Sequence, residues 1–542
     1  MESQRIFILV GLMLVSVLLY QEWQSMYGPQ PITPATSQTS DAMQQPHSDD
    51  VPAAAALNST DMPIVDSKAS ASLITMENDV LRLKIDPKGG DVVSAELLKF
   101  PIEQDGEEPV SILHRNSHFE YIAQSGLIGN DGPDASPSGR PNYSSSQSHY
   151  EMSGDSVVAN LTFEANGMTV IKRFILNKDS YVVQQDFEII NNSGQNALVQ
   201  PYMQLKQTMA GESGSMMMPT YRGPAYSTSD ERYSKYTFDD LTDKALNKRT
   251  DGGWVGMLQH YFVSAWVPTA TSDNLLYTNQ IRGSGIIGAK GEQVVIPAGQ
   301  TTVISSSLFV GPKDQERLSA LSPTLNLTVD YGFLWWLAQP LHWLLTVIQG
   351  FVVNWGLAII VVTIVIKTFL YPLTKKQYES MGRMRVLQPK VKALQERYGE
   401  DKQKMQQAMM ELYKKEKVNP LGGCLPLLLQ MPIFIALYWV LLESVELRHA
   451  GFMLWITDLS VQDPYYVLPL LMGASMFLMQ KLSPTTVADP MQQKVMMFMP
   501  VLMTFLFITF PAGLVLYWVV SNLITIAQQT MINRALEKKQ AA

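Results

Sequence analysis

One lysine lies inside a strongly apolar stretch of this 542-residue chain. Lys367 belongs to the run GFVVNWGLAIIVVTIVIKTFLY, residues 350–371, which is long enough to cross a bilayer because a spanning helix needs about 20 residues. An ionisable group within such a run costs roughly 2.5–3.5 kcal/mol on insertion scales, so it indicates a functional site that faces protein or water. The chemistry that it offers is electrostatic, because an ammonium held at this depth attracts anionic groups.

A membrane-anchoring role for Lys367 is the alternative. The lysine lies four residues before Tyr371, about 6 Å along a helix, so its stem could lie in lipid while the ammonium reaches the headgroups. Thr363, however, lies one turn earlier on the same helical face. This spacing favours a polar stripe over a lone anchor.

Polar side chains also recur along the last apolar run. Steps of three and four place them on one side of a helix, with the first member at the edge of the stripe: Tyr517, Trp518, Ser521, Thr525 and Gln528. Gln430 adds an amide to an earlier apolar run. Hydrogen bonds between helices, worth about 0.6 kcal/mol each, explain any single member. They explain the whole set less well, because no apolar run offers Lys367 an obvious acidic partner, and we therefore expect a hydrated surface.

Methionine is concentrated in the same half of the chain. Flexible thioether side chains suit a surface that accepts varied apolar partners, although ordinary core filling is an equal alternative. The candidate residues for such an apolar slide are Met431, Met472, Met476 and Met503.

Six apolar runs predict a polytopic helical membrane protein. The first, residues 6–20, follows Arg5 without a small-residue cleavage site, so we interpret it as an uncleaved signal anchor, with a cleaved signal peptide as the alternative. Residues 21–330 hold 21 Lys/Arg and 36 Asp/Glu, whereas residues 375–419 hold 12 and 6. Because basic residues stay on the cytoplasmic side of short loops, the acidic region is expected outside, with the basic loop and both termini inside.

The long acidic region changes to a period-two pattern from about Ser67. Short alternating runs separated by turn signals, such as Asn166-Gly167, predict an antiparallel β-sandwich of about 250 residues. Its histidines show no metal-ligand spacing, and residues 211–218 (GESGSMMM) lack the ending of a phosphate-binding loop. We therefore expect a binding or structural domain rather than a hydrolase. Cys424 is the only cysteine, so no intrachain disulfide is possible.

The basic loop has helical periodicity and predicts two antiparallel helices, separated at residues 399–401, with Pro389 kinking the first. Its charge could set topology, contact anionic phospholipid, or dock a ribosome or targeting receptor. Without interleaved aromatic residues, nothing in it indicates nucleic-acid sequence recognition. The candidate docking residues are Arg383, Arg385, Lys390 and Lys392.

Four motifs resemble the YidC/Oxa/Alb family of membrane-protein insertases, in its Gram-negative form. They are YPLT at 371–374, NPLGGCLP at 419–426, QMP at 430–432 and GLVLYW at 513–518. The resemblance covers nearly the whole chain and implies a five-helix core enclosing a hydrophilic groove, closed on the outer side. The family's groove charge aligns with Lys367, where many relatives have arginine; lysine keeps the charge but lacks the planar fork that pairs carboxylates bidentately.

The same resemblance implies a location in the bacterial inner membrane, nascent membrane proteins as clients, and the Sec translocon (SecYEG and SecDF) as a partner. It implies no cofactor, no metal and no catalytic residue. The expected activity is that of an insertase and chaperone, which receives a client's polar tail in the groove and releases its apolar helix into lipid, alone or with the translocon. A membrane enzyme with a sugar-binding sandwich is one alternative, although it would lack a catalytic constellation. A channel is another, weakened by the absence of inverted repeats or charge rings.

The fold class expected is therefore a multi-domain, polytopic α-helical membrane protein with a periplasmic β-sandwich and a cytoplasmic helical hairpin. The expected segments are a signal-anchor span at 1–27, a flexible periplasmic linker at 28–66, the sandwich at 67–322, an interfacial aromatic helix at 323–349, a second span at 350–372, the basic hairpin at 373–419, a third span at 420–444, a periplasmic loop at 445–464, a fourth span at 465–481, a cytoplasmic loop at 482–494, a fifth span at 495–510, a sixth span at 514–532 and a cytoplasmic tail at 533–542.

Overall fold

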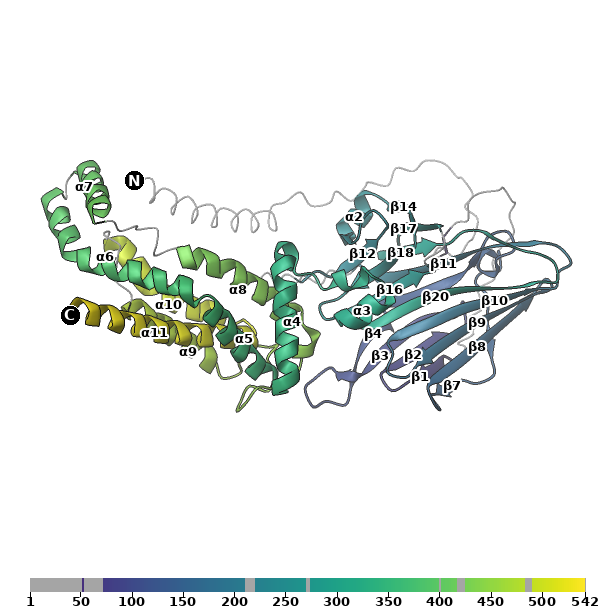
Figure 1. Cartoon of the computed structure of the whole chain (residues 1–542). Coiled ribbons are helices and arrows are strands. Elements are labelled where there is room, and N and C mark those ends of the chain that lie inside the picture. The colour runs from purple at the N-terminus through teal and green to yellow at the C-terminus, as the bar shows by residue number, and fades with distance from the viewer. Residues whose placement is uncertain are drawn as a thin grey trace. The chain divides into compact units, whose positions relative to one another are not determined.

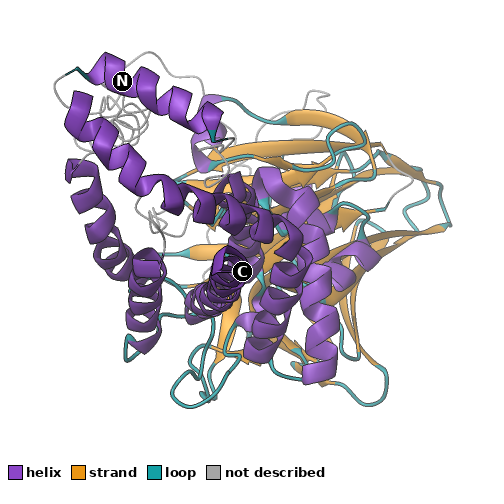
Figure 2. Cartoon of the chain, turned by 60° about the vertical axis from the view of Figure 1, so that its left-hand side comes forward, coloured by secondary structure: helices purple, strands orange, loops and turns teal. Residues whose placement is uncertain are grey.

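The computed structural model describes residues 51–52, 72–209, 220–269, 273–398, 401–416, 425–482 and 490–541. The expected signal anchor, residues 1–27, lies outside the described residues. So does the expected linker, residues 28–66, except for residues 51–52. Strands dominate the described chain up to residue 312 and helices dominate after it. Figure 2 shows the strands in orange and the helices in purple.

Two β-sheets make up the strand-rich part (Figure 1). The first has eleven strands, in the order β14 (Asn247–Asp251), β17 (Asp273–Ile281), β18 (Ser284–Lys290), β11 (Ala197–Thr208), β5 (Glu120–Ile128), β4 (Pro109–Arg115), β3 (Asp91–Pro101), β2 (Leu81–Asp86), β1 (Ile74–Glu77) and β7 (His149–Glu151), with β19 (Val294–Ile296) beside β11. The second has nine, in the order β13 (Ser234–Lys235), β12 (Gly223–Ser227), β15 (Trp254–Leu258), β16 (Phe262–Pro268), β20 (Thr301–Pro312), β10 (Val182–Asn191), β9 (Met168–Asn177), β8 (Ser156–Ala165) and β6 (Ser144–Ser145). Both sheets contribute buried side chains to one hydrophobic core.

The strands follow the alternation in the sequence. In β2, Leu81, Leu83 and Ile85 are fully buried, while the residues between them are half-buried. The predicted turn between β8 and β9 is present, with Asn166 and Gly167 at φ of 50° and 72°, as a two-residue hairpin turn requires. Antiparallel pairing dominates, but β1 and β7 pair in parallel, which the sequence pattern did not predict.

Most of the helices follow the sheets along the chain. After the short helices α2 (Phe238–Asp243) and α3 (Gln315–Leu321), they are α4 (Trp335–Val352), α5 (Trp355–Phe369), α6 (Tyr371–Tyr398), α7 (Lys402–Lys415), α8 (Leu425–Glu443), α9 (Val467–Leu482), α10 (Pro490–Phe507) and α11 (Ala512–Ala541). The aromatic segment is helical as α4, and Pro340 lies within it. The basic loop forms α6 and α7, and Leu387 of α6 packs against Tyr413 of α7.

The apolar run around Lys367 is not one helix. Val353 ends α4 with a φ of 58°, and Asn354 begins α5 by accepting a hydrogen bond from the Leu357 N–H. A bend of 61° then separates α5 from the start of α6. Pro372 explains this break, because a proline in the first turn of α6 cannot donate back to α5. Helix α6 continues through Pro389, and the kink expected there stays a prediction.

By length and hydropathy, one described helix could cross a membrane, namely Ala512–Leu536. The bent pair Trp355–Phe369 and Tyr371–Ser380 would make a second such span. Gln430–Glu443, Val467–Leu482 and Met497–Phe507 are apolar but shorter. The expected count of six spans thus rests on the sequence.

Candidate functional site

Polar side chains from α5, α8 and α11 converge on Lys367. We call the group the polar cluster: Lys367, Gln430, Tyr517, Ser521, Thr525 and Gln528. The Lys367 ammonium donates hydrogen bonds to Gln430 Oε1 and to Thr525 Oγ1, each at 3.0 Å. The Gln430 Nε2 group lies 3.4 Å from the Tyr517 hydroxyl and 3.5 Å from Ser521 Oγ, so one amide connects the lysine to α11.

Helical spacing positions these groups. Tyr517, Ser521 and Thr525 are four residues apart on α11, so they line one face, and Gln528 continues it one turn further. That face packs against α5, where Lys367 occupies the last turn. A cation there is favoured by the helix dipole, because the last carbonyl groups carry partial negative charge.

The charge of Lys367 is not neutralised by a carboxylate within the described part of the chain. Its side chain is nearly buried, with 8% of the residue exposed, and both of its hydrogen-bond partners are neutral oxygens. An ammonium has three N–H donors, so contacts with the described residues engage two of them and leave one. Nearby, the buried Gln528 Oε1 accepts no hydrogen bond from the described residues. The site thus combines an uncompensated charge with spare hydrogen-bonding capacity.

Comparison with known proteins assigns both halves of the chain to one family. Residues 73–344 match the family described as "YidC periplasmic domain", and residues 347–540 match "60Kd inner membrane protein". The chain belongs to the YidC family of membrane protein insertases. It is therefore a multi-pass protein of the bacterial inner membrane, with a large periplasmic β-sheet domain followed by a helical insertase region.

Relatives named "Membrane protein insertase YidC" match end to end. That of Pseudoalteromonas atlantica is 54% identical over 542 residues, and that of Shewanella piezotolerans is 55% identical over 545; each match covers 99% of both chains. A crystal structure described as an active YidC insertase with its first transmembrane domain resolved is 18% identical and covers 85% of this chain and 92% of its own. Its TM-score of 0.37 adds nothing to the family assignment.

Two residues expected in the polar stripe of this YidC-family chain make other contacts. The hydroxyl of Thr363 is buried and donates to the Ile359 carbonyl of its own helix at 2.6 Å. Trp518 packs edge-on against Phe434, with ring centroids 4.4 Å apart, and against Phe507, at 4.7 Å. Trp518 therefore belongs to an aromatic group beside the polar cluster.

The four candidate methionines differ in exposure. Met431 is 44% exposed, Met476 and Met503 are half-buried, and Met472 is fully buried. Met431 is thus the most accessible of the four to an apolar segment.

Four residues of the basic hairpin were candidates for docking. The side chains of three of them, Arg383, Arg385 and Lys392, lie outside the described residues. Lys390 is exposed and forms an ion pair with Glu416 at 2.6 Å.

The two sheets, residues 74–312, form a region that we call the β-domain. It contains a buried charge network that the sequence did not predict. Arg140 pairs with Asp91 and, at 2.9 Å, with Asp134, and all three side chains are less than one-tenth exposed. Lys172 donates to the carbonyls of Gly89 and Ser125 at 3.0 and 2.9 Å. Burial lowers the pKa of Lys172 to about 7, because desolvation of the ammonium outweighs the attraction of Asp91. These contacts hold together segments far apart in the sequence, which is a structural role.

Proposed function

We propose that the polar cluster lines a hydrated groove in which this protein receives the polar tail of a nascent membrane protein. The observation that carries the proposal is the uncompensated Lys367, nearly buried and bonded only to neutral side chains among the described residues. A buried charge without a counter-ion is costly, and water or an anionic ligand offsets that cost. An acidic client tail is such a ligand.

The groove would act by lowering the cost of moving polar groups into the membrane. A client's apolar helix would meanwhile leave along exposed apolar side chains, of which Met431 lies closest in sequence to Gln430. No covalent step or nucleotide is needed, because release of an apolar helix into lipid is favourable by itself. We also propose that the chain crosses the membrane six times, with both termini and the basic hairpin in the cytoplasm. The groove is then closed on the periplasmic side.

The partners that we propose follow the same reasoning. Clients are nascent membrane proteins, inserted alone or beside the Sec translocon. The hairpin, with exposed cations such as Lys390, would contact anionic phospholipid and a ribosome or targeting receptor.

Site-specific photo-crosslinking of a stalled client in membranes tests the groove. A photoreactive side chain is placed at Gln430, Ser521 or Thr525, and matched probes are placed at Leu523 and Phe369, which are 55% and 83% exposed. We expect the probes in the polar cluster to crosslink to the client's tail, and the probes at Leu523 and Phe369 to crosslink to its apolar helix. Tail adducts confined to Leu523 and Phe369 would refute the groove.

A further inference from the structure

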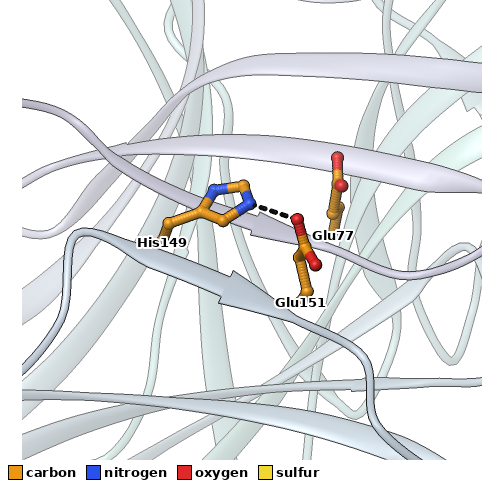
Figure 3. A group of neighbouring side chains, drawn as sticks. All are labelled: Glu77, His149 and Glu151. Atoms are coloured by element: carbon orange, nitrogen blue, oxygen red, sulfur yellow. Dashed lines mark hydrogen bonds and ion pairs between the residues drawn. The ribbon is translucent and has the colours of Figure 1, made fainter.

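Three potential metal ligands meet at the end of the eleven-stranded sheet. Strand β7 pairs in parallel with β1, and the register places Glu151 opposite Glu77. His149 lies two residues before Glu151, so both side chains project from the same face of β7. Figure 3 shows the imidazole and the two carboxylates gathered on this face.

The distances suit a small cation. One ligand atom from each residue lies within 4.8 Å of the other two, and His149 Nε2 is 2.8 Å from Glu151 Oε1. Zinc bonds to nitrogen and oxygen are about 2.1 Å long, so ligands of a tetrahedral ion lie about 3.4 Å apart. No pair of these ligand atoms therefore has to approach by more than about 1.4 Å, and rotation of the exposed His149 and Glu151 side chains permits such adjustments. One imidazole and two carboxylates form a ligand set typical of zinc and related transition metals.

We propose that Glu77, His149 and Glu151 bind one divalent transition-metal ion. Three protein ligands leave one position of a tetrahedral ion open, and solvent can reach it because the His149 side chain is 51% exposed and that of Glu151 70%. The ion clamps β7 to β1, the strand at which the described sheet region begins. This role is independent of the polar cluster and of insertion.

A neighbouring cation limits the affinity. Arg82 donates from Nε to Glu77 Oε2 and from one terminal nitrogen to Glu96 Oε2, at 3.2 Å for the latter. The guanidinium repels a dication, but it engages only one oxygen of Glu77 among the described contacts, which leaves Oε1 for the metal. Without an ion, the group is a His149–Glu151 pair beside a Glu77–Arg82 pair. The site therefore binds a metal only if the two carboxylates and the imidazole act together.

Equilibrium zinc binding to the full-length protein in lipid nanodiscs, after removal of any affinity tag, tests the proposal. Competition with a chromophoric zinc chelator reports affinity and stoichiometry. We expect one site, weakened at least about ten-fold by His149→Ala or Glu77→Gln. The matched controls are His118→Ala, an exposed histidine whose side chain hydrogen-bonds only to Ser117 among the described residues, and Glu96→Gln, which removes an equal charge beside Arg82. Both controls should bind zinc as the parent does.

Amide hydrogen exchange gives a second readout. Zinc should slow exchange in β7, because an ion that binds only the paired strands suppresses their local opening, and a chelator should reverse the effect. The His149→Ala protein should show no such response. The proposal is overturned if the parent does not bind zinc, if all variants bind it equally (an adventitious ion only), or if exchange in β7 ignores the metal.

Discussion

Removal of the Lys367 charge gives the sharpest test of how the polar cluster works. A carboxylate about 6 Å from the ammonium is attracted by about 1.4–2.8 kcal/mol, for effective dielectric constants of about 40 and 20. Lys367→Gln should therefore weaken capture of an acidic tail about 10- to 100-fold. Lys367→Glu replaces attraction by repulsion of similar size and should roughly double the loss in free energy. Lys367→Arg keeps the charge and should retain most of the capture.

The assay measures membrane insertion of a client at limiting insertase concentration, with an acidic tail or with its acids changed to amides. The expected result is a loss with the acidic tail and little change with the neutral one. Lys376→Gln is the matched control, because Lys376 is exposed and follows Lys367 by nine residues. Equal losses for both tails, or an equal effect of Lys376→Gln, would show that the lysine acts through folding or topology rather than through its field.

Three further predictions concern stability. Arg140→Met should destabilise the β-domain by about 3–5 kcal/mol in chemical denaturation, because it leaves two buried carboxylates without their guanidinium. Hydrogen bonds to the Glu231 carboxylate, of which the bond from Lys248 has the largest effect, lower its pKa to about 2. A glutamate in the unfolded chain titrates near about 4.3. Its contribution is complete above pH 4.3 and lost as the pH falls towards 2, so Glu231→Gln should flatten the stability of the domain over that range. Gly473→Ala should cost about 1–3 kcal/mol in thermal unfolding, since the new Cβ would lie 1.9 Å from Thr504 Oγ1, and Thr504→Ala should restore most of it.

Much of the polar cluster could be predicted from the sequence because it depends on local periodicity. Apolar runs of fixed length reveal buried helices, and steps of three and four along residues 517–528 place polar groups on one face. A lysine within such a run indicates a functional site by its residue type alone. The same logic found the strands of the β-domain and its Asn166-Gly167 turn, each encoded within a few residues.

Local patterns do not say which element a side chain meets. Periodicity placed Trp518 with the polar residues, yet its ring packs against Phe434 and Phe507, because a helix face about 100° wide contacts more than one neighbour. The break between α5 and α6 also escaped the hydropathy pattern, which remains apolar through Phe369 and Leu370.

The sequence by itself determined the family, the β-rich and helical halves and the lysine within an apolar run, since each depends on residue type or on short spacing. Only the tertiary structure showed that Gln430 and Thr525 hold that lysine, from helices 63 and 158 residues away. It alone joined Arg140 to Asp91 and brought Glu77 beside His149. The physical reason is the same in each case: chain topology sets contacts between distant residues, and a sequence pattern read a few residues at a time carries no record of topology.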